Sequence, residues 1–136
     1  MGPAFWADVL VAFHACYVGF VVIGELVILL GILFGWKWIR NFWFRLVHLL
    51  MILIVAGEAL AGVECPITVW ERELRVEAGQ PVSDASFVGR MFHDLLFYEN
   101  VDASIFPILH IGFGVLVLLT IYIAPPRWRK VEAEAT

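Results

Sequence analysis

Residues 9–34 read VLVAFHACYVGFVVIGELVILLGILF, an apolar run of 26 residues that contains no Lys, Arg or Pro. About 20 such residues suffice for a helix to cross a hydrocarbon layer roughly 30 Å thick, so this run predicts a tilted membrane-spanning helix. Two ionisable residues interrupt it, His14 and Glu25. At about 100° per residue, both fall on nearly the same helix face. We expect this face to point into protein rather than lipid.

The whole chain has the composition of a membrane protein with several spans. Of its 136 residues, 62% are hydrophobic and 16% are charged, which lies outside the range of soluble globular domains. The net charge of −4 and the lack of a basic stripe exclude nucleic acid as a partner. The first apolar run is far longer than the core of a signal peptide, so we expect the N-terminus to be retained. Cys16 and Cys65 form no CxxC or CxxCH motif, and their predicted depths argue against a disulfide.

Two further spans are predicted, over residues 44–63 and 105–124. Lys and Arg alternate with aromatic residues between the first two spans, as at a membrane–water boundary. Prolines end the second and third spans, because proline removes a hydrogen-bond donor and restricts the residue before it. Small residues near the end of the second span favour close approach by another helix. They are Gly57, Ala59, Ala61 and Gly62.

The segment between the second and third spans, residues 64–103, is polar and predicts short helices outside the hydrocarbon. Thr68 and Glu71 have the spacing of a capping box, and Gly79 suits the position after a helix end, which predicts a helix over 69–78. SFVGRMFHDLLFY, residues 86–98, is amphipathic and too short to span, so we expect it in the membrane interface. Asp102 and Ser104 are N-cap candidates for the third span, and residues 127–136 form a mobile tail.

The predicted fold is therefore an all-α integral membrane domain, with three transmembrane helices in a bundle and short interfacial amphipathic helices on the outer side. Three spans place the two ends of the chain on opposite sides of the membrane. Lys and Arg cluster in residues 35–45 and after Pro126, whereas the N-terminus has none. The positive-inside rule then places the N-terminus outside and the C-terminus in the cytoplasm.

This topology predicts two polar layers inside the bundle. His14, Glu58 and His110 each lie five residues from a predicted outer helix end, about 7–8 Å below that surface at 1.5 Å per residue. They form the expected outer layer. Glu25 and His48 lie nearer the opposite ends of their helices and form a looser inner pair between helices. All five side chains are expected to avoid lipid.

Three interpretations of these layers remain open. His14 and His110, at equal depth on two helices, have the arrangement of a bis-histidine haem b, with His48 as a further candidate ligand. Adding Glu58 gives the ligand set of a non-haem iron or zinc site. Alternatively, these side chains hydrogen-bond across helices and fix their register. Tryptophans are expected as interface anchors. They are Trp36, Trp38, Trp43, Trp70 and Trp128.

One string resembles a known family. Cys65-Pro66-x-Thr68 continues with Glu71, Leu74-Arg75 and Ala78-Gly79, and together with His14, His48 and the closing APPRWR it resembles the family of small bacterial membrane proteins called domain of unknown function 2784. The resemblance covers nearly the whole chain. It implies a bacterial inner-membrane protein without an established activity. It also implies Tyr at the position of His110 in many members, so that a His14–His110 ligand pair is not a family property.

No nucleophile–base arrangement, phosphate loop or metalloprotease motif occurs in the sequence, so we expect no catalysis by this chain alone. The first expectation is a non-catalytic accessory or structural subunit of a larger membrane complex, in contact with membrane lipid and with other subunits or with copies of itself. The second is a b-type haem or metal-binding subunit that carries electrons. The third is a protein that binds lipid or another hydrophobic ligand beneath the interfacial helix.

Overall fold

The computed structural model describes residues 1–82, 90, 94 and 104–127. These residues form four α-helices and one short 3-10 helix, and no strand is found among them. The elements are α1 (Pro3–Phe34), the 3-10 helix η1 (Trp38–Arg40), α2 (Phe42–Ala61), α3 (Pro66–Glu77) and α5 (Ile105–Ile123). Three of them, α1, α2 and α5, are long and apolar enough to cross a membrane. The prediction of an all-α membrane protein with three spans is confirmed.

Helix α1 begins six residues earlier than predicted, at Pro3 rather than at residue 9. Proline suits this position because its fixed φ matches the helix and its missing N–H is not needed in the first turn. The 32 residues of α1 span about 48 Å, well beyond the roughly 30 Å of hydrocarbon. Its buried positions recur every seven residues, as on a helix with one continuous packing seam. They include Ala7, His14, Val21 and Ile28.

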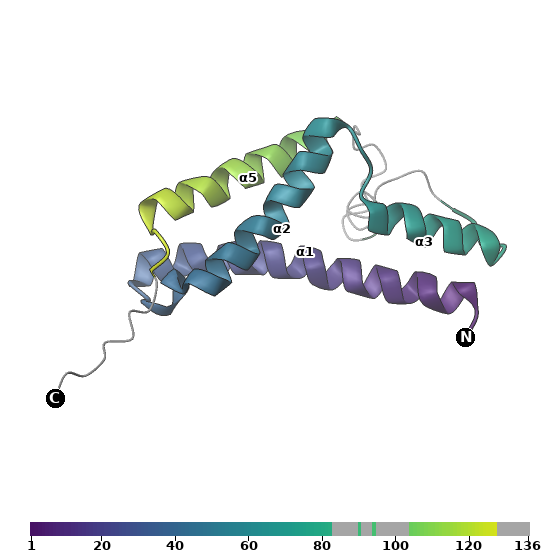
Figure 1. Cartoon of the computed structure of the whole chain (residues 1–136), viewed down its shortest axis with the longest axis horizontal. Helices are drawn as coiled ribbons and strands as arrows, with labels where there is room; N and C mark the ends of the chain where they lie inside the picture. The colour runs from purple at the N-terminus through teal and green to yellow at the C-terminus, as the bar shows by residue number, and fades with distance from the viewer. Residues whose placement is uncertain (83–89, 91–93, 95–103, 128–136) are drawn as a thin grey trace.

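Helix α3 lies antiparallel beside the N-terminal part of α1 (Figure 1), with Arg75 Nη2 3.1 Å from Asp8 Oδ1. It begins at Pro66, so the predicted start at residue 69 was wrong, and so was the capping box at Thr68. The proline after the second span, Pro66, occupies the first turn of α3. Thr68 therefore lies inside the helix, where it is buried, and not at the N-cap. The predicted role of Gly79 is confirmed by its φ of 68° directly after the C-cap.

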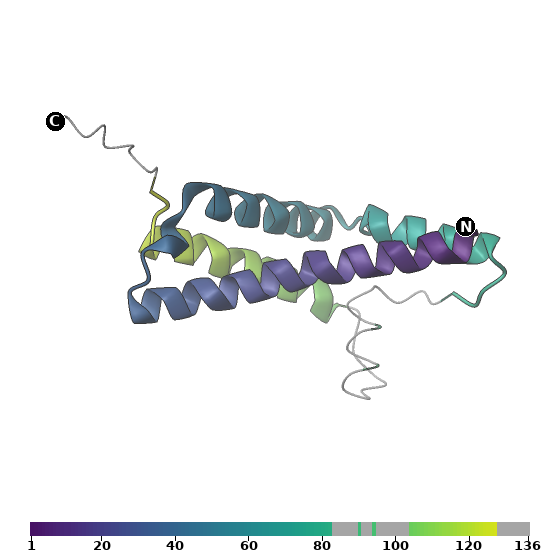
Figure 2. The same ribbon diagram turned by 90° about the horizontal axis from the view of Figure 1, so that it is seen from below.

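Helix α2 begins at Phe42, two residues earlier than predicted, because the side chain of Asn41 caps it by accepting from Phe44 N at 3.3 Å. It ends at Ala61, and Gly62 follows with a φ of 66°. Helix α5 agrees with the predicted third span to within one residue. Figure 1 shows α2 crossing α1 at an angle and rising away from it, and Figure 2 shows α3 following α2 toward the N-terminal end of α1.

The three spans meet in a small apolar core made of Val21 from α1, Ile52 from α2 and Val117 from α5. Gly114 brings α5 close to α2, since a Cβ there would lie 3.5 Å from the Cβ of Ala56. In Figure 1, the C-terminal end of α5 lies near α1, and the N-terminal end of α5 lies farther from α1. The bundle is therefore tightest at the end where α2 begins.

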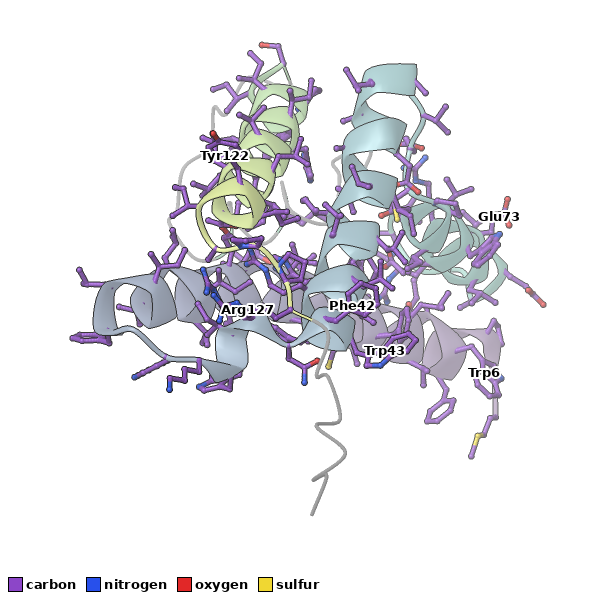
Figure 3. The ribbon with its side chains drawn as sticks, turned by 60° about the vertical axis from the view of Figure 1, so that its left-hand side comes forward. Trp6, Phe42, Trp43, Glu73, Tyr122 and Arg127 are labelled. Carbon is purple, nitrogen blue, oxygen red and sulfur yellow. The ribbon has the colours of Figure 1, made fainter. Side chains whose placement is uncertain are left out.

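That end is closed by backbone contacts between segments far apart in the sequence. Arg127 N donates to Arg40 O at 2.8 Å, which ties the chain after α5 to the turn before α2. Figure 3 shows Arg127 beside the first turn of α2, where Phe42 is labelled. Ile39 of η1 packs into the space above Gly31, where a Cβ would lie 2.4 Å from its side chain.

Several predictions fall outside the described residues. They concern the amphipathic helix over residues 86–98, the N-cap role of Asp102, the anchor Trp128 and the mobility of the tail. Ser104 is the N-cap residue of α5 but makes no side-chain capping hydrogen bond.

Candidate functional site

Four polar side chains from three helices converge in the interior of the membrane bundle. They are Glu25 from α1, Arg45 and His48 from α2, and Thr120 from α5, and each is at most 2% exposed. Ionisable residues so deep in a membrane bundle are costly unless they face one another or a polar cavity, and they commonly mark function. These four residues, the Glu25–His48 cluster, are therefore the strongest candidate site in the described part of the chain.

The His48 ring is held from several sides. Its Nε2 lies 2.8 Å from Val21 O, and because a carbonyl only accepts, Nε2 carries the hydrogen and donates it. Its Nδ1 lies 3.9 Å from Glu25 Oε2. Phe44 stacks on the ring with centroids 6.2 Å apart. Gly24 leaves room for it, since a Cβ there would lie 2.9 Å from His48 Cδ2.

Arg45 contributes the fixed positive charge of this cluster. Its Nη2 donates to Ala124 O at 3.2 Å, at the C-terminal end of α5, where the helix dipole favours a cation. Its charge also acts on Glu25. Among the described residues, Arg45 Nε and Nη1 and both carboxyl oxygens of Glu25 have no hydrogen-bond partner. The cluster thus contains buried groups of opposite charge, and some of their donor and acceptor atoms make no hydrogen bond.

The structure therefore brings together Glu25 and His48, the two residues predicted as an inner interhelix pair. Sequence reasoning missed Arg45, which it assigned to the interfacial turn, and Thr120, which it did not single out. Arg45 lies one helical turn before His48, and this spacing places both on one face of α2. The Asn41 cap was the signal that α2 begins at Phe42, so that Arg45 lies inside the helix rather than at its first residues.

A second polar cluster joins α1 to α3 outside the three-helix core. Glu71, 3% exposed, accepts hydrogen bonds from Arg75 and from Arg90 Nη2, the latter at 2.7 Å. Burial alone would raise the pKa of Glu71, but the hydrogen bonds and charges of Arg90 and Arg75 outweigh it, so that this pKa lies below its ordinary value. His14 is buried beside this cluster, where both Glu71 and Arg90 act on it electrostatically. We call these residues the α1–α3 clip.

Glu58 has different neighbours. His110 and Cys65 both interact with its carboxyl group, and the charge of Glu58 acts on Tyr17 of α1. The Tyr17 hydroxyl donates to Met51 O at 2.6 Å and links α1 to α2. Cys16 and Cys65 are not joined by a disulfide in the structure.

The three residues of the predicted outer layer thus have different neighbours: Glu71 and Arg90 act on His14, whereas His110 interacts with Glu58. The depth estimate placed the start of α1 at residue 9, whereas its first turns extend beyond the bundle and pack against α3. The residue of α1 that interacts with Glu58 is Tyr17, almost one turn further along. No group of three or more His, Cys, Asp and Glu side chains that suits a metal ion occurs in the part of the chain that the structure describes.

The candidate haem ligands occupy three different environments. His14 lies against α3, His48 is bonded to α1, and His110 Nδ1 donates to Phe106 O of its own helix at 2.6 Å. His48 sits at the level of Gly24, ten residues from His14, so about 15 Å along α1 separates them. Both nitrogens of His48 also face protein atoms. His14 and His48 therefore do not share one iron in this arrangement.

The predicted interface anchors are exposed at the two ends of the molecule. Trp36, Trp38 and Trp43 lie at the end where α2 begins, and Trp36 stacks on Trp38. Trp70 lies on α3 at the opposite end. Trp6 of α1 and Glu73 of α3, both labelled in Figure 3, are also exposed, and the sequence reasoning did not name Trp6.

Comparison with protein families gives a match over most of the chain. Residues 4–126 match the family described as "Protein of Unknown function (DUF2784)", which is the family predicted from the Cys-Pro string. The match includes all four described helices except Pro3. No curated protein and no solved structure matches the chain significantly.

Proposed function

We propose a function for this chain, which belongs to the DUF2784 family of proteins of unknown function: it is a non-catalytic accessory or structural subunit of a larger membrane complex. The proposal rests on the outer faces of its spans. In the most apolar stretch of α1, 28% of the residues are buried, and in α2 and α5 the share is 17% each. Most of the surface of each span is therefore available to lipid or to helices of other chains.

The main observation for this proposal is the position of the glycines in the three spans. Gly24, Gly31 and Gly114 each face a close neighbour inside the chain, whereas Gly19, Gly57 and Gly112 have nothing within 4 Å. A glycine in a helix interior lacks a side chain to pack and costs about 0.5–1 kcal/mol relative to alanine in soluble helices. In membranes, glycines favour close backbone contact between helices. Outward glycines on three spans are thus typical of contact with another protein.

The small residues that were predicted to contact a neighbouring helix support the same proposal. Gly57 and Ala61 are exposed on α2, while the contact to α5 is made one position away, at Ala56. We assign the exposed face around Gly57 and Ala61 to a helix of another subunit or of a second copy.

Site-specific photo-crosslinking in intact membranes tests this assignment. A photoreactive residue at Leu60, which is 73% exposed beside this face, is expected to give a discrete protein adduct. Gly57→Leu should reduce that adduct several-fold, because the added side chain blocks close approach. Val47→Leu, a smaller change at an exposed position further round α2, is the control and should leave the adduct intact. Lipid adducts alone at Leu60 would contradict the proposal.

We also propose that the protein resides in the bacterial inner membrane with its N-terminus outside. In the described residues, Lys37, Arg40 and Arg127 lie at the end where α2 begins, whereas the arginines of α3 at the other end are mixed with acidic residues. This asymmetry supports the cytoplasmic placement of the basic end.

The two other functions expected from the sequence give different results with the purified protein. A haem-binding subunit shows a Soret band whose intensity depends on His14 and His110. A lipid or hydrophobic-ligand binder retains a bound molecule in native mass spectra. The groove expected for such a ligand involves residues 86–98, of which the structure describes Arg90 and Asp94 alone.

A further inference from the structure

Between His48 Nδ1 and Glu25 Oε2 there is a position for a proton that no other contact supplies. The hydrogen on His48 Nε2 is donated to Val21 O at 2.8 Å, which fixes the neutral ring with its lone pair on Nδ1. That lone pair faces Glu25 Oε2 at 3.9 Å. An ionised carboxylate and an imidazole lone pair are both acceptors, so they repel each other unless one proton is bound to either atom.

The charges around the pair are few. From α2, Arg45 and His48 act on Glu25, and from α5 the neutral Thr120 does so. The Thr120 hydroxyl donates to Val117 O at 2.8 Å and adds no charge to the cluster. With Glu25 ionised and His48 neutral, Arg45 balances the charge of the cluster. One added proton gives the cluster a single positive charge.

We propose that Glu25 and His48 form a proton-binding site inside the membrane, which takes up one proton per chain with Arg45 as the fixed counter-charge. The proton comes from solvent and forms an N–H bond at His48 Nδ1 or an O–H bond at Glu25 Oε2, and no other bond changes. In the protonated state the two side chains attract each other and join α1 to α2.

A route for the proton is provided by the polar atoms that lack partners. Two of them belong to Arg45 and two to Glu25, and a buried water needs two to four such partners. Arg45 also reaches Ala124, at the C-terminal end of α5. The cluster therefore extends toward the end of the bundle where α2 begins. This inference is independent of the proposed subunit role, because it is tested on the isolated chain.

The first test uses the unmodified protein in lipid nanodiscs, with ¹⁵N-labelled histidine and ¹³C-labelled glutamate. NMR spectra are recorded from about pH 4 to about pH 9, a range that includes the ordinary titration of both groups. The expected result is a His48 ring with hydrogen on Nε2 at high pH, and a coupled gain of one proton by the pair on acidification. A neutral His48 with hydrogen on Nδ1, or no titration of the pair in this range, would overturn the proposal.

The second test compares two variants, with His48→Gln used to assign the histidine signal. Glu25→Gln removes one acceptor, so the pair should no longer titrate as a unit and the pH dependence of the His48 signal should change. Glu58→Gln removes a carboxyl group from the other end of α2 and should leave the His48 signal unchanged. An unaltered His48 titration in Glu25→Gln would also overturn the proposal. If Glu25→Gln fails to fold, the spectra of the unmodified protein decide the question.

Discussion

At the scale of single residues, the account depends on how closely His48 is enclosed. The ring lies between Phe44 and α1, and its hydrogen bond to Val21 O fixes its orientation. Gly24 is the position of α1 that this arrangement requires to be small, because any Cβ there would meet both His48 Cδ2 and Nε2, at 2.9 and 3.2 Å.

Gly24→Ala should therefore destabilise the bundle by about 1–3 kcal/mol, the usual cost of adding a methyl group to a filled interior. The measurement is thermal unfolding in a fixed detergent, with the His48 NMR signal as a second readout. Gly19→Ala is the matched control on the same helix, because nothing lies within 4 Å of Gly19. Equal unfolding temperatures for the two variants would show that His48 does not occupy the space above Gly24.

A second prediction at this scale concerns haem. Because His14, His48 and His110 lie in different environments, we expect the detergent-purified protein to show no Soret band. The absorption spectrum is compared with that of His14→Ala as a control. A Soret band that disappears in His14→Ala or His110→Ala would contradict the arrangement described above.

The burial of individual residues was predicted from the sequence more accurately than the contacts between their side chains. His14 and Glu25 lie on the buried face of α1, and Glu25 and His48 adjoin. The place of His14 was not predictable from depth alone, because a helix of 26 apolar residues does not reveal that its N-terminal turns leave the bundle. The roles of Arg45 and Arg90 depend on contacts over 79 and 19 positions, to Ala124 and to Glu71, which no local pattern encodes.

At the scale of elements, the α1–α3 clip depends on an ionised Glu71. The pKa of Glu71 is lowered, so its ion pairs stabilise the folded clip fully above the pKa of an exposed glutamate, about 4.3. This contribution is lost as the pH falls through the lowered value. We expect the protection of the α3 amides, measured relative to their intrinsic exchange rate at each pH, to fall in that acidic range.

Glu71→Gln tests the same clip at neutral pH. The variant loses two charge-assisted hydrogen bonds, one from Arg90 and one from Arg75, which also pairs with Asp8 of α1. We expect this loss to loosen α3 by about 1–3 kcal/mol and to diminish the acid dependence of α3 exchange. Glu73→Gln, an exposed change on the same helix, should keep both the protection and its acid dependence. If the two variants exchange alike, Glu71 does not hold α3 in place.

Helix boundaries were predicted correctly where one residue determines where the helix ends. Gly79 ended α3 as predicted, because a positive φ there favours glycine. The starts of α1 and α3 were predicted too late, since Pro3 and Pro66 initiate helices while proline was interpreted chiefly as a helix breaker. The start of α2 was missed because the side chain of Asn41 caps it.

At the scale of the whole molecule, the distribution of charge predicts the topology. Reporter fusions at Gln80 and Thr136 should show Gln80 outside and Thr136 in the cytoplasm, because the basic end of the bundle favours the cytoplasmic side. Replacing Lys37 and Arg40 together by glutamine should weaken this preference, whereas replacing the exposed Trp43 by phenylalanine should not. The reverse activities in the unmodified chain would contradict the proposed orientation.

The central claim, that this protein is a subunit bound to other helices, is tested most directly by the mass of the native particle. The chain is extracted from its own membrane in a mild detergent and weighed by native mass spectrometry, next to Gly57→Leu and the Val47→Leu control. We predict a particle larger than one chain for the unmodified protein and the control, and a shift toward the single chain for Gly57→Leu. A fully stable monomer in all three preparations would contradict the claim.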